Sequence, residues 1–448
     1  MASRGKWSSS VGFILAAAGS AIGIGNIWRF PYMTGKYGGA LFLFVYLAAV
    51  VLLGMPVLIA EIAMGRATGK NPVGAFKELS PRGAWKLVGY LGVLAGVMIL
   101  SYYSLISGWT LGYFFKTLAG GLRSVTTATT PGIFAAFSRN FWLQALLLAA
   151  FLLITGTIVA RGIANGIEKA CKVLMPVLFI IMLILLARSL TLPGAGKGLE
   201  FYLKPDFSQL TPRVIIDAMG QAFFSLSLGM GAMITYGSYL RKEESIPAGA
   251  AWVAFLDTFT AVVAGFIIFP ALASYGMSPE GGHPLVFHIL PVIFDQMPLG
   301  AWFGMLFFLL LGVAALASTV SLLEVVVAYC IDERKWSRRK AVLAAGGISF
   351  LFGIPSILSF GDVTFFQKLP LLGVSFFEMM DFVWGTLALS VGALFISIFA
   401  GYVWKKTAAF REIGWGEKGS RLGAVWSFSV RYLCPLLILA TLAMLLAG

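Results

Sequence analysis

Long, uninterrupted runs of apolar residues recur along the whole chain and constrain its fold more than any other feature. Apolar side chains make up 59% of the 448 residues and charged ones 12%, whereas an ordinary soluble domain carries roughly 25% charge. A helix of about 20 apolar residues crosses a hydrocarbon core about 30 Å thick. Because the runs are continuous rather than alternating, helices are favoured over a lipid-exposed barrel. The sequence therefore predicts an all-α polytopic membrane protein.

Eleven of these runs are predicted to span the bilayer. They lie near residues 10–34, 39–65, 87–117, 141–158, 166–189, 212–239, 248–274, 299–330, 341–356, 372–403 and 425–447. Ten or twelve spans is the alternative, because the last run has little flanking charge. With no long linker between the runs, residues 1–448 are expected to form a single transmembrane domain.

The net charge of +14 raises the question of nucleic-acid binding, but the placement of the basic residues argues against it. They lie mostly in short loops, with about 22 on one side of the membrane and about 9 on the other. The richer side is expected to be cytoplasmic, which places the amino terminus inside the cell. The chain is expected to lie in the plasma membrane. Cys171, Cys330 and Cys434 are interpreted as packing residues, since their spacing fits neither disulfides nor a metal site.

Two of the predicted spans contain segments that weaken a helix. Residues 19–26 read Gly-Ser-Ala-Ile-Gly-Ile-Gly-Asn, and residues 224–231 read Phe-Ser-Leu-Ser-Leu-Gly-Met-Gly. Close helix packing through small residues is the simpler explanation of each segment alone. The two spans, however, are the first and the sixth, which head two five-helix halves. Interrupted helices at corresponding positions of two halves indicate the central site of a transporter.

The predicted fold is therefore a 5+5 inverted repeat with the first and sixth helices broken. The repeats cover roughly residues 10–190 and 212–403, and one extra carboxyl-terminal helix follows at 425–447. Backbone groups freed inside a membrane need a partner. Free N–H groups at the start of a half-helix favour a carboxylate, and free carbonyls favour a cation. A zwitterion bound beside sodium meets both needs.

Ionisable residues inside the predicted spans are a second indication of function, because a charge at mid-membrane depth is costly. They are Arg29, Glu61, Asp217, Asp257, Glu324, Asp381 and Arg431. About half of them are expected to have only structural partners. Asp257 and Glu324 lie furthest from any basic loop and are the stronger functional candidates.

Several motifs give the chain a specific family resemblance. They are Trp7, the Gly-Ser-Ala-Ile-Gly-Ile-Gly-Asn-Ile-Trp-Arg-Phe-Pro run of residues 19–31, Gly38-Gly39, residues 61–66, Ser101-Tyr102-Tyr103, residues 221–239 and Asp381-Phe382. The chain resembles, over nearly its whole length, the neurotransmitter:sodium symporters, and in particular their bacterial amino-acid carriers. Gly-Met-Gly at residues 229–231 looks most like a broad-range carrier of hydrophobic L-amino acids.

The resemblance implies one or two sodium ions as coupling ions. It places the first ion against the carbonyl of Ala21 and the side chains of Asn26, Ser225 and Asp257. The negative charge of Asp257, near a position that is neutral in many relatives, implies that chloride is not needed. The second ion is implied at the carbonyls of Gly19, Ile22 and Ala314 and the hydroxyl of Ser318. Ala317 departs from the family pattern there, so this site is expected to be weak, to recruit water or to be helped by Thr319.

The resemblance also implies substrate and gate residues. The substrate residues are Ala21, Ile24, Gly25, Ile99, Tyr103, Phe224, Ser225, Ser227, Met230, Ser318 and Leu322. The outer gate is implied as the pair Arg29 and Asp381, with Tyr103 and Phe224 below it. The inner gate is implied as the pair Arg4 and Asp332 with Trp7, Ser238 and Tyr239 nearby, tuned by Glu324. Gly166 and Pro176 are implied as the points at which the fifth span unwinds.

The expected function is import of a hydrophobic or aromatic L-amino acid with sodium by alternating access, with a monomer sufficient for transport. Transport of another small amine or zwitterion is one alternative. An ion channel is a second, although no ring-forming filter is recognisable. An intramembrane enzyme is a third; the only histidines are His283 and His288, and no hydrolase or zinc-protease motif is present.

Overall fold

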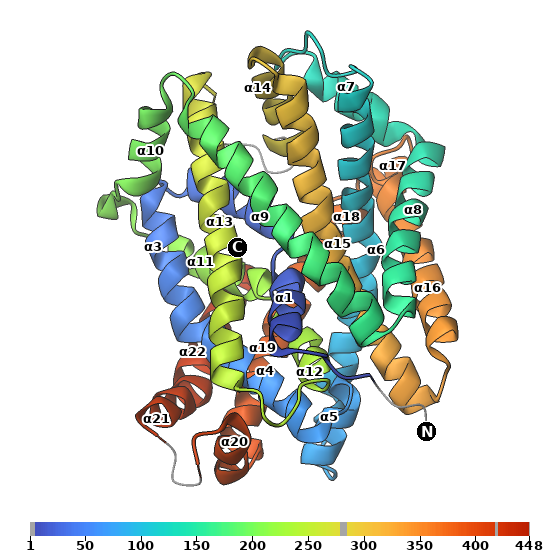
Figure 1. The fold of residues 1–448 in the computed structure, drawn as a ribbon, viewed down its shortest axis with the longest axis vertical. Coiled ribbons are helices and arrows are strands. Elements are labelled where there is room, and N and C mark those ends of the chain that lie inside the picture. The colour runs from blue at the N-terminus through green and yellow to red at the C-terminus, as the bar shows by residue number, and fades with distance from the viewer. Residues whose placement is uncertain (1–4, 278–284, 417–419, 448) are drawn as a thin grey trace.

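The computed structural model describes residues 5–277, 285–416 and 420–447, and every regular element among them is a helix. Among these described residues, nine helical segments are long and apolar enough to cross a membrane, or ten if one bent pair counts as a span. The nine are Ala40–Thr68, Lys86–Leu118, Phe141–Ala160, Ile163–Leu190, Ile246–Ser274, Gly300–Arg334, Arg338–Leu358, Phe376–Val403 and Arg421–Leu445. Figure 1 shows them as one bundle of roughly upright and tilted helices.

Five of the nine segments are continuous α-helices, and the other four contain π-helical turns. The continuous ones are α6 (Lys86–Leu118), α8 (Phe141–Ala160), α13 (Ile246–Ser274), α15 (Gly300–Arg334) and α16 (Arg338–Leu358). The others are α3–η2–α4 (Ala40–Ala49, Val50–Gly54, Met55–Thr68), η3–α9 (Ile163–Glu168, Lys169–Leu190), α18–η6–α19–η7 (Phe376–Met380, Asp381–Ala388, Leu389–Ile398, Phe399–Val403) and α21–η8–α22 (Arg421–Phe428, Ser429–Leu433, Cys434–Ala447).

The first predicted span is broken. Helix α1 (Ser10–Ala21) ends within the glycine-rich run of residues 19–26, and the chain resumes as η1 (Gly25–Arg29) and α2 (Phe30–Lys36) after a bend of 53°. Across the break, the Gly23 amide donates to the side-chain oxygen of Asn26 at 3.0 Å. The side chain of Asn26 thus replaces a helical hydrogen bond that the break removes.

The sixth predicted span is broken too, and this accounts for the difference from the predicted eleven. It consists of α11 (Pro212–Ser225), a turn over residues 226–231, and α12 (Ala232–Gly237), with 14 and 6 residues in the two helices. Neither helix alone reaches the length of a bilayer span. In the turn, Ser227, Gly229 and Gly231 take positive φ angles of 53°, 88° and 75°, which only glycine adopts without strain.

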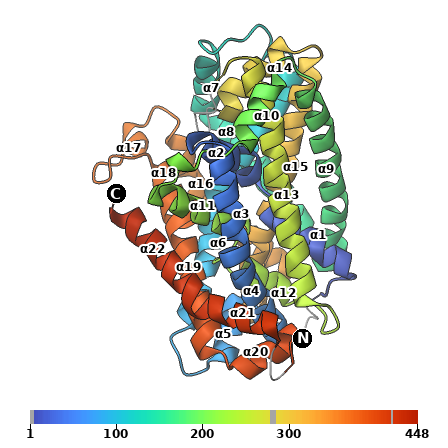
Figure 2. The same cartoon turned by 90° about the vertical axis from the view of Figure 1, so that its left-hand side faces the viewer.

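Short helices cover the two ends of the bundle. At one end lie α7 (Thr130–Arg139), α10 (Ala195–Leu203) and α14 (Leu290–Gln296), and at the other lie α5 (Pro72–Leu79) and α20 (Lys406–Ile413), as Figure 1 shows. The remaining short elements are η4 (Phe207–Gln209), η5 (Leu285–Ile289) and α17 (Thr364–Gln367). Figure 2 shows α22 on the outside of the bundle, alongside α19.

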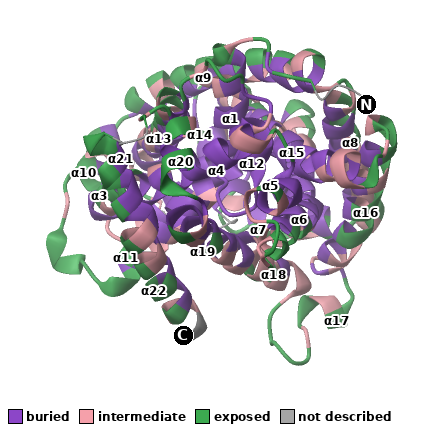
Figure 3. Ribbon diagram, turned by 90° about the horizontal axis from the view of Figure 1, so that it is seen from below, coloured by how far each residue is buried: buried purple, intermediate pink, exposed green. Residues whose placement is uncertain are grey.

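Burial increases from the rim of the bundle to its centre. Seen along the bundle in Figure 3, buried residues gather around α1, α6, α12 and α15, and exposed ones lie on the outer helices. The apolar windows of α6 and α15 are mostly buried, whereas those of α8, α9 and α16 are mostly open. Apolar side chains facing outward on α8, α9 and α16 suit contact with lipid. Helices α1 and α12, which belong to the two breaks, lie among the buried residues at the centre of the bundle.

Candidate functional site

A cavity of about 430 Å³ lies where the two broken helices meet. Its lining residues come from α1, η1, α6, the α11–α12 segment, α15 and α19. They are Ser20, Ala21, Gly23, Gly25, Asn26, Ile99, Tyr103, Phe224, Ser225, Ser227, Met230, Ser318, Leu322 and Leu389. Every predicted substrate residue except Ile24 is among them. Ser20, Gly23 and Leu389 line the cavity without having been predicted.

Backbone groups and hydroxyls form one side of the cavity. The Ile24 amide donates to the Tyr103 hydroxyl at 2.9 Å, so Ile24 contributes to the site through its backbone. A Cβ atom on Gly23 would lie 2.7 Å from that hydroxyl and 2.8 Å from Ser318 Oγ, and one on Gly25 would lie 2.7 Å from the Phe224 ring. Side chains at either position would fill this part of the cavity. The glycines of the first break therefore keep peptide groups accessible to a ligand.

The cavity also has apolar lining side chains, among them Ile99, Met230, Leu322 and Leu389. Met230 lies between two glycines in left-handed conformations. A Cβ on Gly229 would lie 2.1 Å from the Leu389 carbonyl oxygen, and one on Gly231 would lie 2.5 Å from the Pro72 ring. The glycines in Gly-Met-Gly are thus required by backbone conformation and close packing, while the methionine side chain supplies an adaptable wall.

A buried polar cluster centred on Asp257 lies next to the cavity. Asn26 Nδ2 donates to Asp257 Oδ1 at 2.7 Å and to Ser225 Oγ at 3.0 Å, and the Ser225 hydroxyl lies within 2.9 Å of both carboxylate oxygens. The Tyr46 hydroxyl reaches Asp257 Oδ2 at 3.4 Å. All four side chains are fully buried or nearly so. The structure thus brings together three of the predicted first-ion residues and adds Tyr46, which sequence reasoning missed.

The Asp257 carboxylate makes no ion pair with any residue in the described ranges. A buried carboxylate needs charge compensation, and hydroxyl, amide and carboxylate oxygens are ligands that suit a hard cation such as sodium. The Asn26 amide presents its nitrogen to the carboxylate and its oxygen to Gly23. For the Asn26 side-chain oxygen to bind an ion beside Asp257, the amide group must rotate so that its oxygen and nitrogen exchange places.

The predicted second-ion residues also lie together, between α1 and α15. The Ser318 hydroxyl lies 3.1 Å from the Ile22 carbonyl oxygen and 3.4 Å from that of Ala314. A Cβ on Gly19 would lie 3.1 Å from the methyl of Ala317. Thr319 is turned elsewhere, since its hydroxyl pairs with Thr155 of α8 at 2.9 Å. Ala317 therefore presents a methyl group, and no oxygen, at the predicted second-ion site. Thr319 does not supply the missing oxygen, because its hydroxyl points toward α8.

Glu61 holds the second break in place. Its side chain is fully buried in α4, and Oε1 accepts a hydrogen bond of 2.8 Å from the Gly229 amide. The carboxylate thus replaces a helical carbonyl for a peptide group that the turn leaves free. The sequence marked Glu61 as an intramembrane charge but gave no sign of its partner.

A vestibule of about 1240 Å³ lies on one side of the cavity. Arg29 and Asp381 both line it, yet among the described residues no ion pair joins them. The Arg29 guanidinium lies 4.8 Å from the centre of the Phe224 ring. Tyr103 and Phe224 line both the vestibule and the cavity. The rings of Tyr103 and Phe224 separate the cavity from the vestibule, and the predicted gate residues Arg29 and Asp381 are apart from each other above these rings.

The side of the cavity away from the vestibule is closed by aromatic packing. Trp7 is 1% exposed, its indole donates to the Tyr236 carbonyl at 3.0 Å, and its ring packs against Tyr236 and Tyr239. The Tyr239 hydroxyl donates to Glu324 at 2.6 Å, and Glu324 forms an ion pair with Arg338. Glu324 is therefore a paired charge within this closure.

The other predicted gate residues have defined neighbours. Arg4 lies outside the described residues, and Asp332 accepts two 2.9 Å hydrogen bonds from Asn71. The Ser238 hydroxyl donates to the Thr235 carbonyl at 2.6 Å. Gly166 lies in the π-helical turn η3, and Pro176 lies inside α9 without ending it.

Two intramembrane charges and the cysteines have structural surroundings only. Asp217 pairs with Arg213 at 3.2 Å, and Arg431 donates to the Gly401 carbonyl at 2.7 Å. The three cysteines are buried and free, which confirms their interpretation as packing residues. In the part of the chain that the structure describes, no group of histidine, cysteine and acidic residues could hold a metal ion.

Comparison with known proteins relates this architecture to sodium-coupled transport. Residues 4–129 and 139–447 match the model of the "Sodium:neurotransmitter symporter family". A sodium-dependent transporter of Bacillus subtilis is 39% identical over 97% of this chain and 96% of its own length. A human sodium- and chloride-dependent taurine transporter is 30% identical over 85% of the chain and 71% of its own length. The crystal structure of MhsT in complex with L-phenylalanine is similar, with a TM-score of 0.91, 45% identity and coverage of 98% and 99% of the two chains.

Proposed function

The chain belongs to the sodium:neurotransmitter symporter family, whose members are membrane transporters rather than enzymes, and we propose that it imports hydrophobic or aromatic L-amino acids together with sodium. One observation carries the proposal. Two helices broken inside the bundle meet at a cavity that is lined by peptide groups and hydroxyls and by apolar side chains. An L-amino acid with an aliphatic or aromatic side chain likewise combines charged, hydrogen-bonding groups with an apolar side chain.

The polar side of the cavity matches the charged groups of an amino acid. We assign the substrate carboxylate to the amides of Ile24 and Gly25 and to the Tyr103 hydroxyl. The ammonium group then faces the carbonyls of Ala21, Phe224 and Ser225 and the hydroxyl of Ser227. Apolar walls at Ile99, Met230 and Leu322 leave the side chain no polar partner apart from the Ser318 hydroxyl. Similarity to MhsT, whose structure contains L-phenylalanine, supports this substrate class.

The Asp257 cluster is the proposed site of the first sodium ion. Asn26, Ser225 and Asp257 supply side-chain oxygens, the Ala21 carbonyl supplies a backbone oxygen, and the substrate carboxylate completes the set. The charge of Asp257 balances that of the ion. We therefore propose that transport needs no chloride, unlike the relatives whose names include chloride dependence.

The carbonyls of Gly19, Ile22 and Ala314 with the Ser318 hydroxyl form the proposed second sodium site. The Ala317 methyl makes this site the weaker of the two, so the number of coupled ions is one or two. A tenfold sodium gradient and a 100 mV potential together supply about 3.7 kcal/mol per ion. One ion therefore supports an accumulation of between two and three decades, and two ions about five.

The proposed topology has eleven spans. The pair α11 and α12 forms a second broken span that matches α1 and η1–α2, so the repeats cover roughly residues 10–190 and 212–403 and one further helix follows at 425–447. In this arrangement the whole chain is one transmembrane domain, its amino terminus is cytoplasmic, and a monomer is sufficient for transport.

The proposed mechanism is alternating access, and the structure fits its outward-facing state. The vestibule is large and Arg29 is apart from Asp381, while Trp7, Tyr239 and Glu324 close the other side. Entry of substrate then brings Arg29 and Asp381 together above Tyr103 and Phe224. Contacts made in only one state shift the populations of the two states.

An uptake screen in vesicles tests this function. Purified protein is reconstituted and offered each common amino acid, taurine and a small amine, with and without a sodium gradient. Saturable, sodium-dependent uptake of leucine, phenylalanine or tryptophan is expected. Preference for taurine or an amine would reject the substrate class, and unitary currents in a planar bilayer would indicate a channel.

A further inference from the structure

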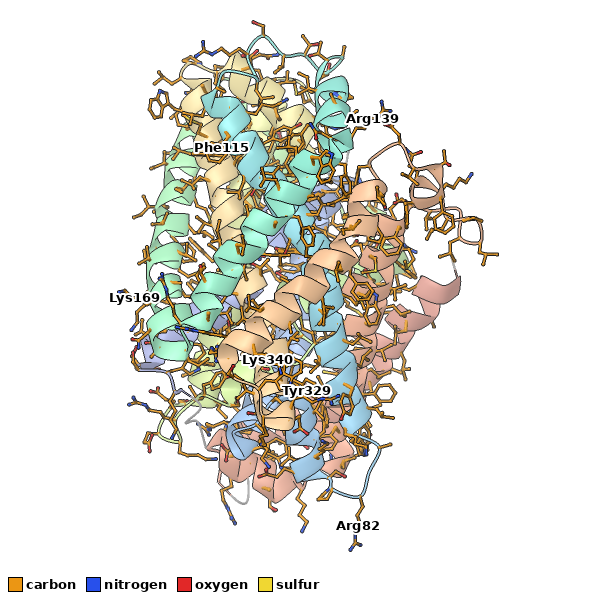
Figure 4. The ribbon with its side chains drawn as sticks, turned by 90° about the vertical axis from the view of Figure 1, so that its right-hand side faces the viewer. Arg82, Phe115, Arg139, Lys169, Tyr329 and Lys340 are labelled. Atoms are coloured by element: carbon orange, nitrogen blue, oxygen red, sulfur yellow. The ribbon has the colours of Figure 1, made fainter. Side chains whose placement is uncertain are left out.

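A second cavity, unrelated to the transport site, opens on the outer face of the bundle between α8 and α16. It holds about 1160 Å³ and is lined by the facing stripes of the two helices, residues 149–160 and 339–350. Each stripe runs for about 16 Å along its helix. In Figure 4 the two helices cross the front of the molecule beside one another, and Lys340 is labelled at the lower end of α16. We refer to this cavity as the α8–α16 groove.

Glycines form the floor of the groove. Cβ atoms built on Gly346 and Gly347 would meet no atom within 4 Å, so both positions face open space. Below them the helices are in contact, since a Cβ on Gly156 would lie 3.3 Å from Val342 and one on Gly353 would lie 2.7 Å from Leu148. The groove is therefore a furrow with a closed floor, and its walls are almost entirely apolar.

One end of the groove is positively charged. Arg339 is exposed and lines the groove, and in the described part of the chain its side chain makes no hydrogen bond or ion pair. The neighbouring Arg338 is already engaged by Glu324 and by the Val159 carbonyl. Arg161, at the end of α8, is also exposed. A free guanidinium thus lies at the end of the apolar furrow, where α16 begins and α8 ends.

We propose that the α8–α16 groove binds one anionic phospholipid. An acyl chain lies in the furrow above Gly346 and Gly347, and the phosphate lies against Arg339. Arginine recognises phosphate by paired hydrogen bonds as well as by charge. A basic residue at the membrane surface favours an anionic headgroup, and a neutral, zwitterionic lipid gains little from it.

Native mass spectrometry of the delipidated full chain tests the proposal, with phosphatidylglycerol and phosphatidylcholine titrated separately. Phosphatidylglycerol should bind the unaltered chain more tightly. Arg339→Gln should weaken phosphatidylglycerol binding about fivefold and phosphatidylcholine binding clearly less, because choline offsets the charge of the phosphate. Gly347→Leu should weaken both, because leucine fills the furrow without a clash. Arg82→Gln, at the far lower tip in Figure 4, and Gly196→Leu, on α10 with nothing within 4 Å, are the matched controls.

Three outcomes would overturn the proposal. The first is equal affinity of the unaltered chain for the two lipids, and the second is an unchanged phosphatidylglycerol affinity in Arg339→Gln. The third is a dimer of the chain that dissociates in Gly347→Leu and that added lipid does not dissociate. The last result would assign the groove to a second copy of the chain. Sodium-dependent uptake by Arg339→Gln is measured in parallel, so failure of the lipid site is distinguishable from failure of transport.

Discussion

At the residue scale, Asn26 connects the first helix break to the buried carboxylate, because its amide reaches both Gly23 and Asp257. Asn26→Ala removes this link and a proposed ion ligand. Loss of a hydrogen bond to a charged group costs about 1.5–3 kcal/mol, so sodium-dependent amino-acid binding should fall by one to two decades. Scintillation proximity with labelled amino acid measures the effect. Asn165→Ala, at an exposed asparagine, is the control, and unchanged binding by Asn26→Ala would reject the first-ion assignment.

Asp257 carries the charge that we propose makes chloride unnecessary. Asp257→Asn removes this charge and leaves the hydrogen-bonding shape of the side chain nearly intact. Uptake by the variant should therefore increase when gluconate is replaced by chloride, whereas uptake by the unaltered chain should not change. Asp217→Asn, which removes a charge that pairs with Arg213 and accepts a hydrogen bond from the Tyr37 hydroxyl away from the cavity, is the control. Equal uptake by Asp257→Asn in both salts would contradict the proposed charge substitution.

Met230 forms part of the apolar wall and contacts the substrate side chain in the proposed site. Met230→Ala enlarges that wall, so competition assays should show a shift in preference among leucine, phenylalanine and tryptophan, with little change in sodium affinity. Met233→Ala removes a buried methionine of α12 that does not line the cavity. A uniform loss across all three substrates in Met230→Ala, matching that of Met233→Ala, would argue against a pocket role.

The residues of the cavity could be predicted to a large extent, because the family resemblance implied most of them, both in the two breaks and in α6 and α15. Contacts between distant segments could not. Tyr46 and Leu389 lie in ordinary apolar runs, and nothing local marks them as neighbours of Asp257 or Met230. Glu324 was predicted as an isolated charge, yet it pairs with Arg338, which follows in the next helix.

At the element scale, the second break is a built feature of the fold. Gly229 takes a φ of 88°, donates to Glu61, and lies against the Leu389 carbonyl. The break thus has a fixed conformation and a dedicated acceptor. Helix propensity predicts where the chain weakens, but the shape of the turn depends on α4 and α19, which lie far away in sequence.

Gly229→Ala tests whether this turn has a required geometry. Alanine is strained at a positive φ by about 1–3 kcal/mol, and its methyl would lie 2.1 Å from the Leu389 oxygen. The variant should unfold at a clearly lower temperature in detergent, as followed by tryptophan fluorescence. Gly220→Ala, on α11 with nothing within 4 Å, should melt at the same or a higher temperature. Equal melting temperatures for the two variants would show that the turn tolerates other shapes.

At the scale of the whole molecule, the account depends on two broken helices meeting in one place. The all-helical, many-span architecture was predictable from composition and run length. The number of spans is harder to establish. A criterion based on helix length finds nine or ten spans among the described residues and counts neither α11 nor α12. The end of α11 and the turn that follows it line the site. In the proposed topology, α11 and α12 together form the span that a criterion based on helix length does not count.

The central claim is that an amino acid and a sodium ion bind side by side between the breaks and share the substrate carboxylate. Thermodynamic linkage tests it most directly: the amino-acid affinity of the purified chain is measured over a range of sodium concentrations, and its sodium affinity with and without saturating amino acid. The two ligands should strengthen each other by the same factor, on the order of tenfold or more. Amino-acid binding that does not respond to sodium would contradict the account.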